Sequence, residues 1–172
     1  MHVLHAAHFA DADTAVVSST TLVSANTEII AREQWQKRQW GGEPVAAIEG
    51  DLRAVIDTCE WVAIATTGPD GPHLAATWGD YVRALGVTDE VILIPAGGLQ
   101  QTEANLSANP RIELLFASRE VKGSRGGPGK GCLVGGWADV QVTGPAMETV
   151  KVRFPWARGV LVVHVERVTP QL

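Results

Sequence analysis

The sequence has few cysteines, few charges and no long apolar run, and each shortage excludes a class of protein. Its two cysteines, Cys59 and Cys132, are too few for a disulfide scaffold and are expected to be free thiols in a reducing cytoplasm. Charged residues make up 19% of the chain and the net charge is -5, so the dense basic face that nucleic acid requires is missing. No uncharged apolar run approaches the roughly 18 residues of a membrane span. Residues 1–10 contain no Lys or Arg, unlike an export signal, which favours a cytoplasmic protein.

The remaining composition suits one folded domain with an appendage. The chain has 172 residues, of which 45% are apolar, too many for a disordered protein. Residues 1–50 hold six acidic residues against three basic ones and show little periodicity. We therefore predict an N-terminal extension over 1–50, consisting of a mobile tail and one helix over 27–40, and a folded domain over 51–172. The spaced histidines near the start are interpreted as part of the tail and not as a metal site.

The folded part is predicted to be mainly β. Leu52, Val55, Ile56 and Cys59 recur at helical spacing and predict a helix over 49–59. Beyond it, apolar runs separated by Gly and Pro turns predict strands over 61–67, 73–85, 90–95, 111–118, 132–143 and 158–168, helices over 99–108 and 145–154, and a glycine-rich loop over 119–131. Strands and helices do not alternate regularly, which favours a small, mostly antiparallel barrel over a doubly wound parallel sheet.

The common motifs of catalysis are missing. The glycine-rich stretch 123–130 departs from the phosphate-loop pattern in spacing and has Gly131 where Ser or Thr should bind magnesium. There is no Gly-x-Ser-x-Gly motif for a serine nucleophile. Cys59, Cys132 and His164 are interpreted as structural residues, so no catalytic residue and no metal ligand are assigned.

Two short clusters suggest a binding site. Thr77, Trp78 and Tyr81 are expected on a strand, where aromatic rings and a hydroxyl could frame a flat polar ring. Gly97 and Gly98 lead into a predicted helix with Thr102 in its first turn, where free backbone N–H groups favour an anion. Core packing and an ordinary capping turn would explain the two clusters equally well.

Further along, several short stretches keep the order and nearly the spacing of a known family. They are Val62 to Thr66, Asp70 to Leu74, Thr77 and Trp78, Tyr81, Pro95, Gly97 and Gly98, Thr102 to Asn105, Gly126 to Gly131, Asp139, Gly144 and Pro145, Arg153 and Phe154, Trp156 to Arg158, Leu161 and Val162, and Leu172. With these stretches, residues 52–172 resemble the small FMN-binding split-barrel proteins of sulfate-reducing bacteria. That group is part of the pyridoxamine 5'-phosphate oxidase-like superfamily.

The resemblance implies a six-stranded antiparallel Greek-key barrel, a homodimer, and one FMN per subunit near the subunit interface. Thr77, Trp78, Tyr81 and Trp156 correspond to positions that line the flavin. Gly97, Gly98, Gln101 and Thr102 correspond to the turn and helix start that hold the cofactor, and Leu172 to a residue that reaches the flavin of the partner subunit. The implied function is that of a noncovalent flavoprotein, either an electron carrier with an unknown redox partner or an FMN-dependent oxidoreductase.

Three departures from the family pattern affect the expected cofactor site. Gln101 replaces a lysine, Ala76 replaces an asparagine, and Asp80 replaces a serine. Because charge-assisted hydrogen bonds are stronger than neutral ones, the loss of the lysine predicts weaker FMN binding. The departures keep two alternatives open, namely a split-barrel oxidoreductase that uses a deazaflavin or haem, and a cofactor-free structural dimer.

Overall fold

The computed structural model describes residues 47–171, so the predicted tail, the predicted helix over 27–40 and Leu172 lie outside the described residues. The helices are α2 (Gly50–Thr58), α3 (Gly79–Leu85), α4 (Gln100–Ala108) and α5 (Pro145–Arg153). The strands are β1 (Trp61–Gly68), β2 (Gly71–Trp78), β3 (Val91–Ala96), β4 (Arg111–Lys122), β5 (Pro128–Gln141) and β6 (Gly159–Gln171). Of the described helices, none is both long and apolar enough to cross a membrane.

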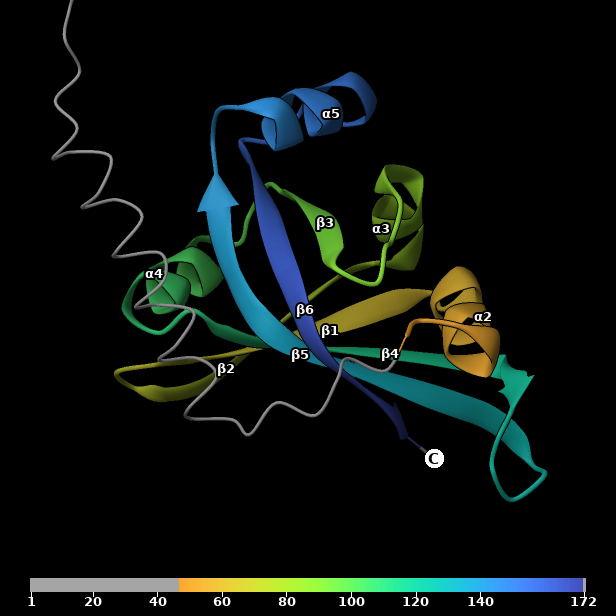
Figure 1. The fold of residues 1–172 in the computed structure, drawn as a ribbon. Helices are drawn as coiled ribbons and strands as arrows, with labels where there is room; N and C mark the ends of the chain where they lie inside the picture. Colours follow the sequence, from red (N-terminus) through yellow and green to blue (C-terminus); the bar gives the residue numbers. More distant parts are fainter. Residues whose placement is uncertain (1–46, 172) are drawn as a thin grey trace, which may run out of the picture. The chain divides into compact units, whose positions relative to one another are not determined.

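The six strands form one curled antiparallel sheet in the order β2-β1-β4-β5-β6-β3 (Figure 1). The last strand, β6, lies between β5 and β3, so β3 joins the sheet beside a strand that follows it much later in the chain. A β-bulge between Gly135 and Gly136 helps β5 to bend, and a Cβ at Gly136 would come within 1.9 Å of the His164 carbonyl oxygen. These features confirm the predicted six-stranded split barrel.

Alternating side chains place the core inside the curl. In β4, Ile112, Leu114 and Phe116 are buried, whereas Glu113 and Leu115 face outward. Helix α2 covers one end of this core, where it buries Val55 and Ile56, as its helical spacing predicts. Burying each such side chain contributes about 1.5–3 kcal/mol, so these contacts hold α2 firmly on the sheet. A second, smaller core beneath α5 consists of Met147, Val150, Ala157, Val160 and Val162.

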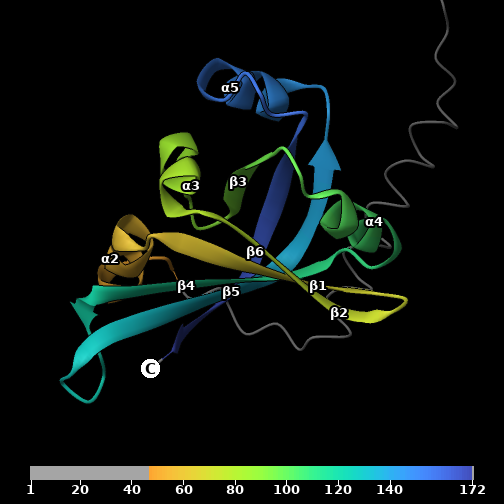
Figure 2. The same ribbon diagram turned by 180° about the vertical axis from the view of Figure 1, so that it is seen from behind.

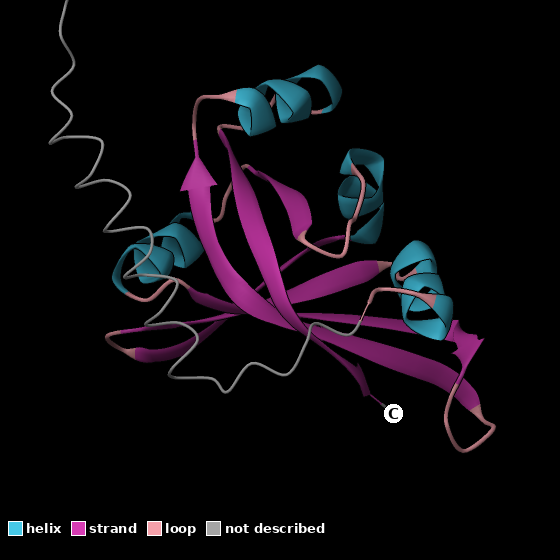
Figure 3. Ribbon diagram, viewed as in Figure 1, coloured by secondary structure: helices cyan, strands magenta, loops and turns pink. Residues whose placement is uncertain are grey.

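The prediction of a strand over 73–85 was wrong beyond Trp78, where the chain turns into α3 (Figure 3). The reason is a close approach at Gly79, whose N–H donates to the Glu60 carbonyl oxygen at 2.8 Å. A Cβ at Gly79 would lie 2.3 Å from the Cys59 carbonyl oxygen, so only glycine fits. The buried Val82 then follows Gly79 at helical spacing. Tyr81 therefore lies on a helix, and not on the predicted strand together with Thr77 and Trp78.

The glycine-rich loop over 119–131 is shorter than predicted, because β4 and β5 extend into it. Lys122 pairs with Pro128, and the turn between them is closed by a hydrogen bond from Gly123 N–H to the Gly127 carbonyl oxygen at 2.8 Å. Gly126 has a φ of 83°, a conformation that favours glycine. This hairpin and α4 lie at opposite ends of the sheet in both views (Figure 2).

Candidate functional site

The start of α4 offers hydrogen-bond donors without protein acceptors. Leu99 occupies the N-cap position and makes no side-chain capping bond, which leaves the first N–H groups of the helix without an intrahelical partner. In the first turn, Thr102 is 1% exposed, and its buried Oγ1 has no hydrogen-bond partner among the described residues. A buried hydroxyl without a partner costs about 1–3 kcal/mol, so Thr102 Oγ1 is a candidate hydrogen-bond donor to a ligand at the helix start.

Polar side chains fasten α4 to the end of β1. Asn105 Nδ2 donates to Thr66 Oγ1 at 3.1 Å, and Gln101 Nε2 donates to Asn105 Oδ1 at 2.9 Å. A Cβ at Gly68 would lie 2.1 Å from Asn105 Oδ1, so a larger residue there would displace the Asn105 amide from its hydrogen bonds. Gln101 itself is exposed at the helix start. The sequence-predicted residues Gln101 and Thr102 therefore lie on one rigid turn.

A cluster of three aromatic rings lies above the turn that leads into α4. The centroid of the Tyr81 ring lies 5.1 Å from that of Phe154 and 5.6 Å from that of Trp156. The Trp156 ring covers Gly97, where a Cβ would lie 2.9 Å from Trp156 Cζ3. Trp156 remains 53% exposed and Trp78 54% exposed, so each indole has surface available to a flat ligand.

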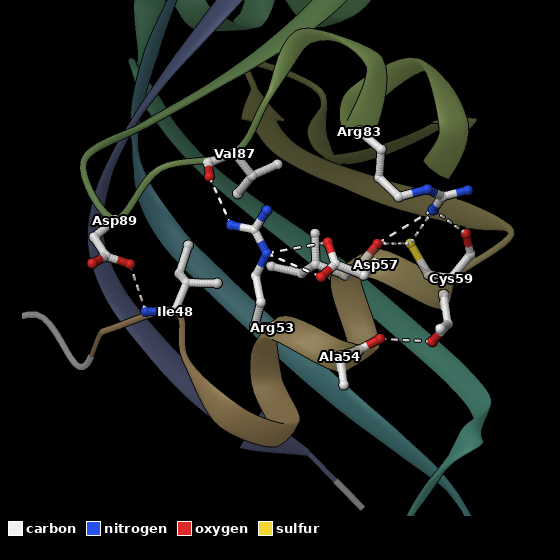
Figure 4. Close-up of polar contacts among 10 residues, drawn as sticks. Ile48, Arg53, Ala54, Asp57, Cys59, Arg83, Val87 and Asp89 are labelled. Atoms are coloured by element: carbon white, nitrogen blue, oxygen red, sulfur yellow. Dashed lines mark hydrogen bonds and ion pairs between the residues drawn. The ribbon is translucent and has the colours of Figure 1, made fainter.

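Helix α3, which carries Tyr81, is held by α2 (Figure 4). Arg83 Nη1 donates to the Cys59 carbonyl oxygen at 2.7 Å and to the Ile56 carbonyl oxygen at 3.3 Å. Arg53 Nη1 similarly donates to the Val87 carbonyl oxygen at 2.8 Å. The guanidinium groups thus satisfy carbonyl oxygens at the end of α2 and after α3, and so fix the helix that positions Tyr81.

An ion pair that sequence reasoning missed joins the two parts of the site. Arg158 Nε donates to the Gly97 carbonyl oxygen at 2.9 Å, and Arg158 Nη2 lies 2.6 Å from Glu103 Oε2. Both residues fall within stretches that resemble the flavoprotein family, but their pairing spans two segments distant in the sequence. No local pattern could have predicted that contact.

The structure brings most of the predicted site residues into one region. The Trp156 ring contacts both Tyr81 and Gly97 and so connects them. Thr102 precedes Glu103 in the first turn of α4, which follows Gly97 in the chain. Thr77 and Trp78 end β2 and lead directly into α3, whereas Gly98 is exposed on the turn before α4. The predicted contribution of Leu172 falls outside the described residues.

Two of the residues that depart from the family pattern, Ala76 and Asp80, lie on β2 and in α3. Ala76 is exposed on β2, and Asp80 is exposed in the first turn of α3, where the helix dipole favours a negative charge. Helices α3 and α4 lie apart in both views, so the Asp80 carboxylate is in a different element from the proposed anion site (Figures 1 and 2).

The described thiols and histidine have shifted acidities that follow from burial. Burial raises the pKa of the Cys59 thiol and raises the pKa of the Cys132 thiol to about 11. Burial lowers the pKa of His164, whose ring stacks on Trp137 at 3.6 Å, while Asp139 partly opposes the shift. Residues 47–171 contain no group of three or more His, Cys, Asp or Glu placed to share a metal ion.

A shallow open groove of about 360 Å³ lies elsewhere, between the end of α2, the start of β1 and the β4–β5 hairpin. It is lined by Thr58, Glu60, Trp61, Ala117, Ser118, Arg119, Glu120, Gly129 and Lys130. No residue of the predicted flavin site is among them. Lys130 Nζ is already paired with Asp51 Oδ2 at 2.6 Å, which joins the hairpin to α2.

The curled six-stranded sheet defines a split-barrel protein, in which the start of α4 lies beside an aromatic cluster. Comparison with known families gives the same result, since the family model of pyridoxamine 5'-phosphate oxidase matches residues 48–169. The chain therefore belongs to the pyridoxamine 5'-phosphate oxidase family.

Individual relatives agree with this membership. The chain is 45% identical over 104 residues to an FMN-binding protein of Nitratidesulfovibrio vulgaris, a match that covers 60% of this chain and 82% of that protein. Two crystal structures share the fold. HupZ of Group A Streptococcus has a TM-score of 0.60 and 22% identity, covering 72% of this chain and 99% of HupZ. An FMN-binding protein from Syntrophomonas wolfei has a TM-score of 0.52 and 14% identity, covering 89% of this chain and 96% of that one.

Proposed function

We propose that this protein is a noncovalent FMN-binding flavoprotein that acts in electron transfer or flavin-dependent oxidoreduction. The observation that carries the proposal is the buried Thr102 hydroxyl at the uncapped start of α4, which has no hydrogen-bond partner within residues 47–171. A relative with 45% identity is itself an FMN-binding protein, which supports the choice of cofactor. The proposed binding residues are Thr77, Trp78, Tyr81, Gly97, Gly98, Gln101, Thr102 and Trp156, together with Leu172 of the partner subunit.

The start of α4 would hold the phosphate. Thr102 Oγ1 can donate to a phosphate oxygen, as can the backbone N–H groups of the first turn. A hydrogen bond to a charged group contributes about 1.5–3 kcal/mol, and the helix dipole adds about 0.3–1 kcal/mol. The one acidic side chain in this turn, Glu103, is paired with Arg158, so its charge is balanced when a dianion binds.

The aromatic cluster would hold the isoalloxazine ring. Trp156 and Trp78 each expose about half of their surface, and the Trp156 ring packs against Tyr81 and Phe154, with centroids 5.6 and 5.7 Å away. Contact between stacked aromatic rings contributes about 0.5–1.5 kcal/mol beyond the area that it buries. FMN bound in this position supplies one- and two-electron redox chemistry.

A titration with two flavins tests the assignment. The purified protein is examined for flavin absorption and released FMN, and the apoprotein is then titrated with FMN and with riboflavin, which lacks the phosphate. Thr102→Val should weaken FMN binding about tenfold or more and leave riboflavin binding unchanged, because only FMN uses the hydroxyl. Thr149→Val, on the exposed face of α5, is the matched control.

Two results would contradict the proposal. A colourless protein that takes up neither flavin would make a cofactor-free dimer the better hypothesis. Equal weakening of both flavins by Thr102→Val would show that the hydroxyl does not serve the phosphate.

We further propose that the protein is a homodimer. The edge strand β2 leaves Leu74 73% exposed and Trp78 54% exposed, and apolar side chains on an open sheet edge are suited to contact with a second subunit. Light scattering during gel filtration should give twice the mass of the chain. A monomer at micromolar concentration would contradict this and would also remove Leu172 from the flavin site.

A further inference from the structure

Arg158 lies where the barrel strands and the helix start meet. Gly159, the first residue of β6, pairs with Ala96, the last residue of β3, and the Arg158 N–H donates to the Ala96 carbonyl oxygen at 2.9 Å. This register puts Arg158 opposite the turn at Gly97. Its side chain then continues across that turn to the first turn of α4, where Nη2 reaches Glu103.

The turn that Arg158 crosses has little stiffness of its own. It contains Gly97 and Gly98, which have no side chains to restrict the backbone and lose more freedom on folding than other residues. Leu99 gives no side-chain cap that would fix the helix start. The hydrogen bond from Arg158 Nε to the Gly97 carbonyl oxygen is half-buried, so it is less exposed to competition from water than a surface contact is.

Residues 154–158, which include Arg158, also carry Trp156 of the aromatic cluster. Trp156 covers Gly97, and between Trp156 and Arg158 the side chain of Ala157 is fully buried. The Ala157 N–H also donates to the Phe154 carbonyl oxygen at 3.0 Å. Residues 154–158 therefore form one anchored unit that touches the proposed ring site through Trp156 and the proposed phosphate site through Arg158.

We propose that Arg158 is a positioning residue that couples the two ends of the flavin site. Its guanidinium holds the Gly97 turn and the Glu103 side chain of α4 at a fixed place relative to Trp156. The inference rests on the proposed flavin function. Arginine suits this role because Nε of its planar fork donates to the Gly97 carbonyl oxygen while Nη2 makes a charge contact with Glu103, whereas lysine offers a single point charge.

The test uses the full chain with Arg158→Met, Arg158→Lys and Glu103→Gln. Arg119→Met, on the exposed part of β4 away from the site, is the matched control. For each protein the dissociation constants of FMN and riboflavin are measured, together with flavin fluorescence quenching at saturation and the thermal midpoint of the apoprotein. Quenching reports how closely the flavin ring contacts Trp156. If Arg158 had a purely structural role, its replacement would leave this quenching unchanged.

Coupling predicts that both flavins are affected. Arg158→Met should weaken FMN binding about tenfold and riboflavin binding about threefold, with less quenching of both, because the turn beneath Trp156 is released. Arg158→Lys should have flavin affinities and quenching between those of the wild type and those of Arg158→Met. Glu103→Gln should weaken FMN binding less than Arg158→Met, since the bond to the Gly97 carbonyl oxygen remains.

Three outcomes would overturn the inference. If Arg158→Met weakened FMN binding alone, Arg158 would act at the phosphate only. If the thermal midpoint fell while affinities and quenching stayed constant, the residue would be merely structural. If Arg158→Met did not fold, unchanged riboflavin affinity in both Arg158→Lys and Glu103→Gln would refute the coupling. A wild-type protein that binds neither flavin would instead refute the proposed function, before any variant is compared.

Discussion

Replacing Gln101 with lysine should destabilise the free protein while tightening its binding of FMN. Gln101 is exposed in the first turn of α4, and its amide donates to Asn105 Oδ1. Lysine replaces the amide donor with an ammonium on a longer side chain, so this hydrogen bond, which contributes about 0.5–1.5 kcal/mol, is lost where the ammonium extends into solvent. It would also place a cation at the positive end of the helix, at a cost of about 0.3–1 kcal/mol. At an exposed position the lower values apply, so the loss is about 1 kcal/mol, or roughly 3 °C in the melting temperature.

When FMN is bound, the same lysine is expected to be favourable, because its charge lies near the phosphate. Position 101 precedes Thr102, whose buried hydroxyl is the proposed phosphate donor. A lysine ammonium at that turn adds a charge-assisted contact of about 1–2 kcal/mol, which corresponds to about 5- to 30-fold tighter binding. Riboflavin, which has no phosphate, should bind Gln101→Lys as it binds the wild type.

The assay is a fluorescence titration of both apoproteins with both flavins, combined with a thermal melt. Ala108→Lys is the matched control, because it adds the same charge at the opposite, exposed end of α4, about 10 Å along the helix. A cation there is stabilising, and FMN affinity should change by less than about twofold. The placement of the phosphate would be refuted if FMN affinity were the same in Gln101→Lys and the wild type. It would also be refuted if riboflavin binding tightened equally.

Three further results are expected. Gly97→Ala should weaken the binding of FMN and of riboflavin about tenfold in the same titration, because the alanine Cβ would lie 2.9 Å from Trp156 and displace the indole ring. Unchanged affinity would contradict the stacking role of Trp156. Cys59 and Cys132 should resist Ellman's reagent at pH 8 in the folded protein and react after unfolding, since burial raises both pKa values. The lowered pKa of His164 means that the unfolded chain takes up its proton first, so stability should fall as pH drops below about 6.5. Urea unfolding at pH 5.5 and 7.5 should show a smaller difference in His164→Gln, and an equal one would exclude the histidine as the cause.

Much of the fold could be predicted because its elements carry clear local patterns. Val55 and Ile56 mark one face of a helix, and the alternation of Ile112, Leu114 and Phe116 marks a strand with one face inside. The sequence of residues 79–85 predicts a strand where the structure has a helix, because that helix depends on the contact between Gly79 and Cys59, which belong to different parts of the fold. A local pattern contains no information about such a close approach.

The site could be predicted only in part for a similar reason. Gly97 and Thr102 stand out locally as a glycine turn before a helix, and family resemblance added Trp156. The fact that the Thr102 hydroxyl is buried without a partner depends on the packing of α4, and the contact between Arg158 and Glu103 depends on the register of β3 with β6. Both are properties of the assembled sheet.

The order of the strands has a consequence for how the protein is made. The apolar strand β3 pairs with β6, which is synthesised after every other strand of the described sheet. Until then the Val-Ile-Leu-Ile run of β3 has no neighbour on that side, and short apolar β-rich segments of this kind associate readily with one another. Termination before β6 would therefore leave two sheet partners, β3 and β5, without their shared neighbour. The sheet can therefore close between β5 and β3 only after β6 has been synthesised, and until then β3 is exposed to association with other chains.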